Sequence, residues 1–381
     1  MKTMSIKPKV LVFSDWYLPG YKAGGPISSV ANIVSSLGNE IEFKIICSDR
    51  DYIDDVPYDL PLNQWVNRGL EEVMYISPDR RRFTDIKELI REEDPDVVYI
   101  NGIFSKVFSI YALRSARALR KRTVVAPRGM LAPGALSIKP AKKKVFLAIA
   151  RFLGVFNRVV FHATHENEME HIQSRFPNSE VSVIPNLPSF AEAVIDSSGK
   201  VENSVRILSI ARIAPEKNTL FAIQALMEIS TKYLVDATFV GHAYSQKYFE
   251  ECRKLAQKLP EHINVKFSGA VKPSELKPYF EGSDLFFLPT LGENYGHAII
   301  ESLLQGIPVL ISDQTPWRNL REDGLGADLP LDDLADFTRE IEVIAAMDGE
   351  AYNNHFRNVV SNASKRIDLK STKNLYRELF R

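Results

Sequence analysis

The chain has 381 residues, more than one hydrophobic core usually organises, so we expect two domains. Hydrophobic residues make up 45% and charged residues 25%, the composition of an ordinary globular protein. Lys and Arg together number 48, as do Asp and Glu, so no overall charge indicates nucleic acid as a partner. No apolar run approaches the roughly 18 residues of a membrane-spanning helix, and residues 1–9 lack the apolar stretch of a signal peptide. Cys47 and Cys252 show no metal-ligand spacing, so we expect buried thiols in the reducing cytoplasm.

Short apolar runs predict strands along the whole chain. In the first half these runs are Val10–Phe13, Phe43–Cys47, Val73–Ile76, Val97–Ile100, Thr123–Ala126, Val159–Phe161 and Val181–Ile184. In the second half they are Arg206–Ile210, Ala237–Val240, Val265–Ser268, Leu285–Leu288 and Val309–Ile311. Their continuous apolar character is typical of strands buried on both faces of a parallel sheet.

Amphipathic patterns between these runs predict helices. They are Ser28–Leu37, Ile86–Glu92, Val107–Arg120, Leu220–Ile229, Tyr248–Leu259, Ser274–Phe280 and Ala298–Gln305, followed by a helical tail from Leu331. Strands that alternate with helices indicate an α/β fold. Because the alternation runs twice, we expect two Rossmann-like domains with parallel sheets facing a central cleft, where the strands' carboxyl ends bind ligands.

A segment rich in proline and serine between Pro185 and Ser204 separates the two runs and predicts a linker. We therefore assign 1–188 to the first domain, 189–204 to the linker and 205–365 to the second domain. Residues 366–381 are expected to form a helix that packs back on the first domain.

Several loops after first-half strands hold candidate binding residues. The loop after Val10–Phe13 ends in Gly24 and Gly25, which permit close approach of the backbone to a ligand. A glycine-rich turn with no ligand role is the alternative. Asn101 ends the strand at Val97–Ile100, and Arg128 follows another strand as a candidate phosphate ligand. We expect His162 and His165 to be structural.

Residues 139–156 combine clustered lysines with many apolar side chains. Such a segment suits the surface of an anionic membrane. It equally suits a helix packed in the core with a solvated lysine edge, and the sequence leaves both alternatives open.

The loop and helix after Leu285–Leu288 carry two glutamates eight positions apart, Glu293 and Glu301, around a glycine at which the helix begins. Helix amides attract anionic oxygens and carboxylates hold hydroxyls, so a nucleotide joined to a sugar would fit. Earlier in the same half, Arg212 and Lys217 lie in a strand–helix loop, where two cations can neutralise a diphosphate.

Arg212-x4-Lys217 followed by Glu293-x7-Glu301 resembles the donor site of retaining glycosyltransferases of family 4, which have the GT-B fold. The variant Glu-Asn-Tyr-Gly-His with Ser312-Asp-Gln-Thr-Pro-Trp resembles members that build bacterial surface polysaccharides. The resemblance implies a donor-binding second domain, an acceptor-binding first domain and a hexosyl transfer that needs no metal or cofactor.

The resemblance also implies roles for individual residues. Arg212 and Lys217 would grip the diphosphate, Glu293 the hydroxyls of the donor sugar, and Glu301 the ribose. The donor would also contact the backbone of the loop after Glu293, namely Asn294, Tyr295, Gly296 and His297. Gly269 and Val271 would flank the base, and the glycine pair of the first domain, Gly24 and Gly25, would face the sugar and diphosphate. Asn101 and Arg128 are candidates on the acceptor side, although many members of the family carry a histidine near Arg128.

Asp49-Arg50-Asp51 matches the Asp-x-Asp metal motif of other glycosyltransferases, but its distance from the donor motifs favours a solvated loop. The resemblance implies two partners, a nucleotide-diphosphate sugar that is UDP-linked and a glycan or polyprenyl-linked acceptor for surface polysaccharide. Two alternatives remain open, a nucleotide-sugar epimerase with the same fold and a non-catalytic nucleotide-sugar-binding protein.

Overall fold

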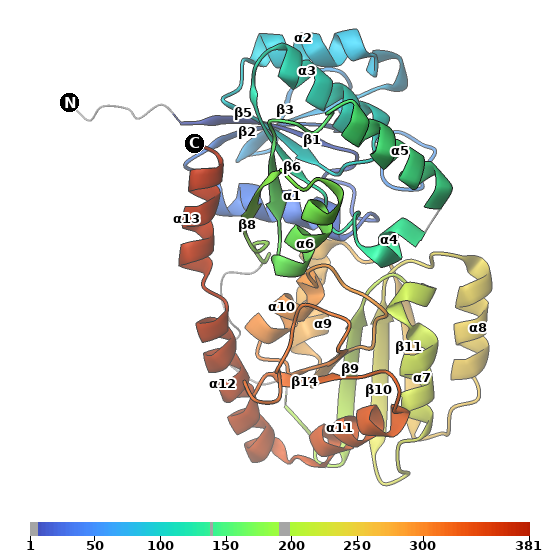
Figure 1. Ribbon diagram of the computed structural model, residues 1–381. Helices are drawn as coiled ribbons and strands as arrows, with labels where there is room; N and C mark the ends of the chain where they lie inside the picture. Colours follow the sequence, from blue (N-terminus) through green and yellow to red (C-terminus); the bar gives the residue numbers. More distant parts are fainter. Residues whose placement is uncertain (1–6, 138–139, 190–198) are drawn as a thin grey trace. The chain divides into compact units, whose positions relative to one another are not determined.

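The computed structural model describes residues 7–137, 140–189 and 199–381, and the chain divides into two compact units. The first unit consists of Met1–Ser189 and Leu369–Arg381, and the second of Phe190–Asp368 (Figure 1). Most of the predicted linker, residues 190–198, lies outside the described residues.

The first unit contains an eight-stranded sheet in the order β3-β4-β2-β1-β5-β6-β7-β8. All neighbouring strands are parallel except the short β3, which runs antiparallel to β4. The strands are β1 Lys9–Ser14, β2 Glu42–Ser48, β3 Val66–Asn67, β4 Glu71–Ile76, β5 Val97–Asn101, β6 Arg122–Ala126, β7 Val160–Ala163 and β8 Glu180–Val183.

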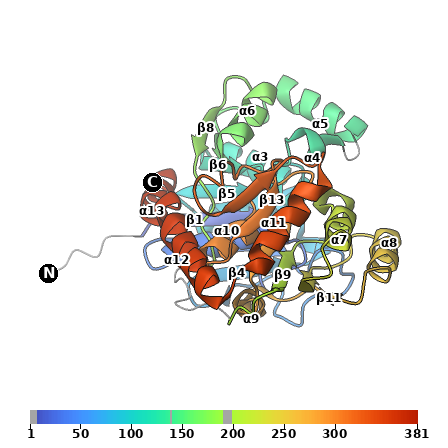
Figure 2. The same cartoon turned by 90° about the horizontal axis from the view of Figure 1, so that it is seen from below.

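Helices cover both faces of this sheet (Figures 1 and 2). They are α1 Gly25–Leu37, α2 Phe83–Glu93, α3 Ala112–Ala118, α4 Pro133–Ser137, α5 Pro140–Phe152, α6 Glu166–Arg175 and α13 Leu369–Leu379. Alternate residues of β1 show why both faces are covered: Val10 and Val12 pack into one core with α1 and α13, whereas Leu11 and Phe13 pack into another with α2 and α3.

The second unit has a six-stranded, wholly parallel sheet in the order β11-β10-β9-β12-β13-β14. Its strands are β9 Ser204–Ile210, β10 Leu234–Val240, β11 Ile263–Gly269, β12 Leu285–Leu288, β13 Val309–Ser312 and β14 Gly326–Leu329. Its helices are α7 Thr219–Met227, α8 Gln246–Ala256, α9 Lys277–Glu281, α10 His297–Leu304, α11 Leu334–Ala346 and α12 Gly349–Arg366.

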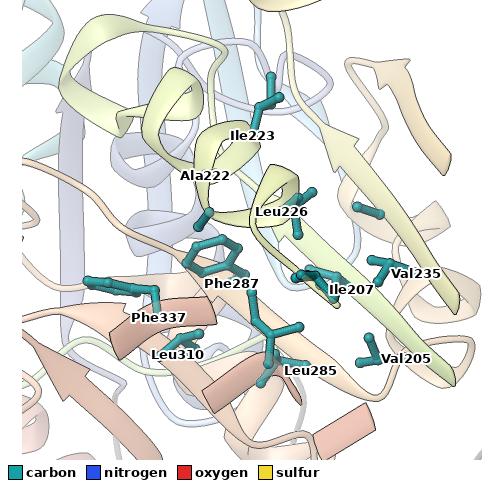
Figure 3. Packing of buried hydrophobic residues seen from close by; sticks show 14 of the residues in the cluster. Val205, Ile207, Ala222, Ile223, Leu226, Val235, Leu285, Phe287, Leu310 and Phe337 are labelled. Atoms are coloured by element: carbon teal, nitrogen blue, oxygen red, sulfur yellow. The ribbon is translucent and has the colours of Figure 1, made fainter. Parts of the chain in front are cut away.

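Two cores hold this second sheet. On one face, Leu226 of α7 and Phe337 of α11 pack with Phe287 of β12 (Figure 3). On the other face, Phe286 and Leu288 of the same strand pack with α10 and α12. The predicted α/β class with two parallel-sheet domains is thus confirmed.

Some predicted elements differ from the observed ones. The helix predicted at Val107–Arg120 begins as a π-helical turn at Lys106–Tyr111 and ends at Ala118. The short strands β3 and β14 and the helices α4 and α6 were not predicted. Most strands extend one to three residues beyond their apolar runs, because ladder hydrogen bonds continue where the side chains turn polar.

Candidate functional site

The strand order of the second sheet reverses between β9 and β12, which are the first and fourth strands of this unit along the chain. Ligands of open parallel sheets bind beyond the carboxyl ends of strands at such a reversal. The loops that follow β9 and β12 meet here: the Leu291 amide and the Thr290 hydroxyl both donate to the Glu216 carbonyl, each at 2.9 Å. The structure therefore brings the two predicted donor motifs to one place.

Lys217 and Glu293 form an ion pair across the two loops, with 2.7 Å between Nζ and Oε2. Their side chains are 14% and 21% exposed, so water screens the pair only partly. Burial raises the pKa of the Glu293 carboxyl, but the Lys217 charge and hydrogen bond, and the Asn294 amide, outweigh burial and leave the pKa below its ordinary value. Glu293 is therefore an anion at neutral pH.

Arg212 precedes Lys217 in the same loop, and its guanidinium donates to the Glu216 carboxylate at 2.8 Å. Its guanidinium also lies over the Tyr244 ring, 5.7 Å from the centroid. Because its side chain is 36% exposed, the cation remains accessible to an anion from solution. The two predicted diphosphate ligands thus share one loop.

Gly296 precedes α10 with a φ of 80°, a left-handed conformation that favours glycine. A Cβ here would lie 2.7 Å from Ile299 Cδ1 and 3.3 Å from Glu293 Cγ. The turn therefore lets α10 begin directly beside Glu293. The amino-terminal end of α10 adds its positive dipole to the Lys217 charge.

Glu301 lies inside α10 and is 7% exposed, so it is a buried carboxylate and not a surface residue of the helix. Burial and the nearby Glu301 carboxylate raise the pKa of the Tyr295 hydroxyl far above its usual range. The Tyr295 ring contacts the His297 ring edge-on at 5.2 Å, and its carbonyl accepts from the Trp317 indole at 2.6 Å. These contacts fix the backbone of the predicted sugar-binding segment.

Gly269 ends β11 and Val271 follows it, two strands away from the reversal. The Gly269 carbonyl accepts from the Gly241 amide at 2.8 Å. A Cβ on Gly241 would lie 1.9 Å from the Ala211 carbonyl oxygen, beside Arg212. The sequence reasoning missed Gly241, although a glycine directly after the predicted strand Ala237–Val240 was the available signal.

The strand order of the first sheet also reverses, between β1 and β5, and three predicted residues gather there. Asn101, at the end of β5, donates to the Ser14 hydroxyl at 3.1 Å and to the Pro26 carbonyl at 3.0 Å. Gly24 and Gly25 lie next to Pro26 at the start of α1. Asn101 thus fixes the predicted glycine loop.

Arg128 completes this cluster, because its guanidinium donates to Asn101 at 2.8 Å, Asn186 at 2.5 Å and Tyr99 at 2.6 Å. The three acceptors are neutral, so the hydrogen bonds hold the cation in place without neutralising it. The sequence reasoning missed Glu168, a buried carboxylate that accepts from the next amide, Gly129, at 2.6 Å.

The prediction of a solvated loop at Asp49-Arg50-Asp51 is wrong, because both carboxylates are buried. Asp49 pairs with Arg50 and Arg81. Asp51 accepts from the backbone amides of Tyr21 and Lys22 at 2.8 and 3.1 Å, which fixes the loop leading to the glycine pair. Sequence spacing could not reveal that these donors surround the motif.

The two histidines make hydrogen bonds within the first unit, and both cysteines are buried as predicted. His162 is buried between the Tyr99 hydroxyl, at 2.7 Å, and the Ile184 carbonyl, at 2.9 Å. His165 caps α6 through a hydrogen bond from the Glu168 amide. Both cysteines are buried and free. In the described part of the chain, no group of three or more His, Cys, Asp or Glu side chains could hold a metal ion, and the prediction of metal independence stays a prediction.

Comparison with known proteins finds a family match in the second unit. Residues 190–333 match the model of the family "Glycosyl transferases group 1". The resemblance to glycosyltransferases that was inferred from the motifs is thus confirmed, whereas membership of family 4 stays a prediction.

Relatives and solved structures extend the likeness over most of the chain. It is 21% identical over 342 residues to alpha-monoglucosyldiacylglycerol synthase of Acholeplasma laidlawii, covering 83% of each chain. It is 21% identical over 304 residues to the "Uncharacterized 41.2 kDa protein in cps region" of Klebsiella pneumoniae, covering 78% of this chain and 81% of the relative. A match to the Streptococcus pneumoniae alpha-monoglucosyldiacylglycerol synthase is 29% identical but spans only 26% of that protein.

Among solved structures, Anabaena HepE in complex with UDP and glucose superimposes with a TM-score of 0.70 at 17% identity, covering 98% of this chain and 99% of that one. Sucrose-phosphate synthase from Thermosynechococcus elongatus gives a TM-score of 0.69 at 15% identity, with 98% and 99% covered. These structures establish the GT-B fold.

No helix in the described ranges is both long and apolar enough to cross a bilayer.

Proposed function

We propose that the chain is a retaining, metal-independent hexosyltransferase of family 4. It moves a sugar from a UDP-linked donor to a hydroxyl of a glycan or polyprenyl-linked acceptor in the synthesis of cell-surface polysaccharide. The observation that carries the proposal is the Lys217–Glu293 ion pair at the strand-order reversal, with α10 beginning beside it.

The chemistry of the transfer explains why this site suits it. As the bond between sugar and phosphate breaks, negative charge grows on the diphosphate and positive charge on the sugar. Arg212 and Lys217, with the amino terminus of α10, supply fixed positive charge for the leaving group without a metal. Lys217 has to share its contact with Glu293 when the diphosphate binds, and this exchange leaves the Glu293 anion beside the developing oxocarbenium ion.

The remaining donor contacts are assigned by the resemblance to family 4. Glu293 accepts from hydroxyls of the sugar, and the backbone from Asn294 to His297 meets the sugar and distal phosphate. Glu301 holds the ribose, and Gly269 and Val271 flank the base. Buried carboxylates bind hydroxyls strongly because little water competes with the hydrogen bond.

The acceptor assignment rests on the first unit and on the relatives. By the resemblance to family 4, Gly24 and Gly25 are assigned to the donor phosphates, and Asn101 and Arg128 to the acceptor. Two relatives are synthases of a glucosylated diacylglycerol, and another belongs to a cps region, which supports a lipid-linked or polysaccharide acceptor. Retention follows if the departing phosphate takes the proton of the acceptor hydroxyl on the same face of the sugar.

A donor and acceptor screen tests the proposal. The purified full-length chain is incubated with UDP-glucose, UDP-galactose, UDP-N-acetylglucosamine and GDP-mannose, with and without a bacterial membrane lipid extract, and with or without a chelator. Free UDP that appears only with acceptor, with the donor's anomeric configuration kept in the product, supports the proposal. An altered sugar still attached to nucleotide indicates an epimerase, and an inverted linkage overturns the retaining mechanism.

A further inference from the structure

Helix α5 is apolar on two opposite faces. One face packs into the first unit, where Leu147 and Ala150 are buried in the core. The opposite face carries Val145, Ile149 and Phe152, and Leu153 follows directly after the helix; these four side chains are 59%, 53%, 89% and 62% exposed. Spacings of four and three residues place Val145, Ile149 and Phe152 on one stripe of the helix, and Leu153, whose amide donates to the Ile149 carbonyl at 2.9 Å, extends that stripe. The structure thus excludes the alternative of a helix whose apolar residues are all packed in the core.

The stripe matters because large apolar side chains are costly to leave in water when they adjoin one another. Phe152 alone is almost fully exposed. Figures 1 and 2 both show α5 at the periphery of the first unit. The buried side chains by which α5 packs into the core are Leu147 and Ala150, so this packing does not require Val145, Ile149, Phe152 or Leu153 to be apolar.

The chain segment that contains the stripe carries charges of one sign only. Residues 97–165 contain no Asp or Glu, whereas they contain the basic residues Lys106, Arg114, Arg117, Arg120, Lys121, Arg122, Arg128, Lys139, Lys142, Lys143, Lys144, Arg151 and Arg158. In a chain with equal totals of basic and acidic residues, this segment is strongly cationic. Lys142, Lys144 and Arg151 are exposed and border the stripe. Arg117 of the neighbouring α3 region donates to the Gly154 carbonyl at 2.8 Å, which brings more of these cations to the end of α5.

We propose that α5 docks on an anionic lipid bilayer, with Val145, Ile149, Phe152 and Leu153 inserted at the boundary of headgroups and acyl chains and Lys142, Lys144 and Arg151 against anionic headgroups. An exposed apolar stripe bordered by cations is the pattern of helices that lie in a membrane interface. Each cation near such a surface adds attraction that salt screens.

Charge complementarity decides between the possible occupants. A second copy of this face would bring cation against cation, with no acidic residue between 97 and 165 to pair with them. A nucleic acid would satisfy the cations but would leave the aliphatic side chains and Phe152 in water. An anionic bilayer satisfies both the charge and the apolar area. This inference does not rest on the proposed function, and its test needs no nucleotide.

Vesicle flotation with the full-length chain tests the proposal. Neutral phosphatidylcholine vesicles are compared with vesicles that contain about 30% anionic phosphatidylglycerol, at low salt and at about 0.5 M NaCl. We expect binding to the anionic vesicles at low salt and its loss at high salt. Lys142→Gln with Lys144→Gln should lower the partition constant roughly thirtyfold, since each cation contributes about fivefold. Phe152→Ser with Leu153→Ser should lower it at least about tenfold.

Matched variants on the second unit control for general effects of these changes. Leu234→Ser removes a leucine that is 62% exposed, as Leu153 is, and Lys254→Gln with Lys258→Gln removes two exposed lysines of another helix region. These controls should bind vesicles as the native chain does, and all variants should keep the native thermal transition.

Four results would overturn the proposal: no binding to anionic vesicles at low salt, equal binding to neutral vesicles, unchanged binding by the Phe152 and Leu153 variant, or self-association in solution that this variant abolishes. Retention of duplex DNA that depends on Lys142 and Lys144 but not on Phe152 would likewise reject the bilayer in favour of nucleic acid. Vesicle binding without any sugar transfer would leave this proposal standing while the proposed function fails.

Discussion

Replacing Lys217 by alanine removes the cation that holds Glu293 across the two loops of the second unit, at 2.7 Å. A charge-assisted hydrogen bond contributes about 1.5–3 kcal/mol, and partial exposure of both side chains favours the lower half of that range. We therefore expect a loss of about 1.5–2 kcal/mol in the free energy of unfolding. In a domain of this size, the loss lowers the melting temperature by roughly 3–6 °C, so the variant remains folded at 25 °C.

The effect on transfer should be much larger than the effect on stability. Removing one fixed charge that stabilises a leaving group lowers kcat by about 10²–10³-fold. Acceptor-dependent release of UDP measures this loss, and circular dichroism confirms that the variant is folded. Lys254→Ala, which removes an exposed lysine of α8, serves as the control and should keep native activity. A folded Lys217→Ala variant with kcat close to native would refute the donor-site assignment.

The same variant has a pH signature. The pKa of Glu293 lies below its ordinary value of 4.5 in the folded chain, so its contribution to stability is fully present above that pH and is lost as the pH falls through the lowered pKa. Without Lys217, burial is the largest remaining influence and raises the pKa of this carboxyl. The stability difference between native and variant chains, measured by urea unfolding, should therefore shrink as the pH falls below about 4.5. A difference that stays constant down to pH 3 would contradict the ion pair.

Three further predictions address other positions. Glu301→Gln should weaken UDP binding by about 1–3 kcal/mol, and unchanged affinity in calorimetry would exclude the ribose contact. Gly241→Ala places a Cβ at 1.9 Å from the Ala211 carbonyl and should cost at least about 2 kcal/mol of stability, whereas a native thermal transition would show that the close approach is relieved easily. Burial, followed by the Arg128 charge, lowers the pKa of His162 to about 3, so stability should fall by up to about 1.4 kcal/mol per pH unit as the pH drops from 6.5 towards 3. His162→Gln should flatten that dependence in urea unfolding, and an unchanged slope would assign the acid sensitivity to other groups.

The sequence predicted the strands of both sheets because buried parallel strands are continuously apolar, as in Leu285–Leu288, whose predicted and observed bounds coincide. Elements without that signal were missed. β14 reads Gly-Ala-Asp-Leu, with no β-branched residue, and α6 buries only Glu168 and Ile172. The order of strands, and hence the two reversals at which the loops meet, is a property of tertiary pairing that local patterns do not encode.

For the candidate site, the residue types and their spacing predicted which loops matter but not how the side chains pair. Lys217 and Glu293 were assigned separate ligands, whereas the structure joins them to each other. Asp51 shows the same limit, because its donors are backbone amides 29 and 30 residues away, and backbone donors leave no trace in sequence spacing. Burial of Glu301 was equally invisible, since a glutamate inside a helix is usually exposed.

Acceptor-dependent release of UDP by the native chain and by Glu293→Gln tests the central claim most directly. The substitution keeps the shape of the side chain but removes the anion that lies beside the sugar in the proposed complex. We predict that the native chain releases UDP from one UDP-sugar only when acceptor is present, and that Glu293→Gln, folded and able to bind UDP, is slower by at least about 10²-fold. Equal rates for the two proteins, or release by neither with any donor, would contradict the claim that the Lys217–Glu293 pair forms a sugar-transfer site.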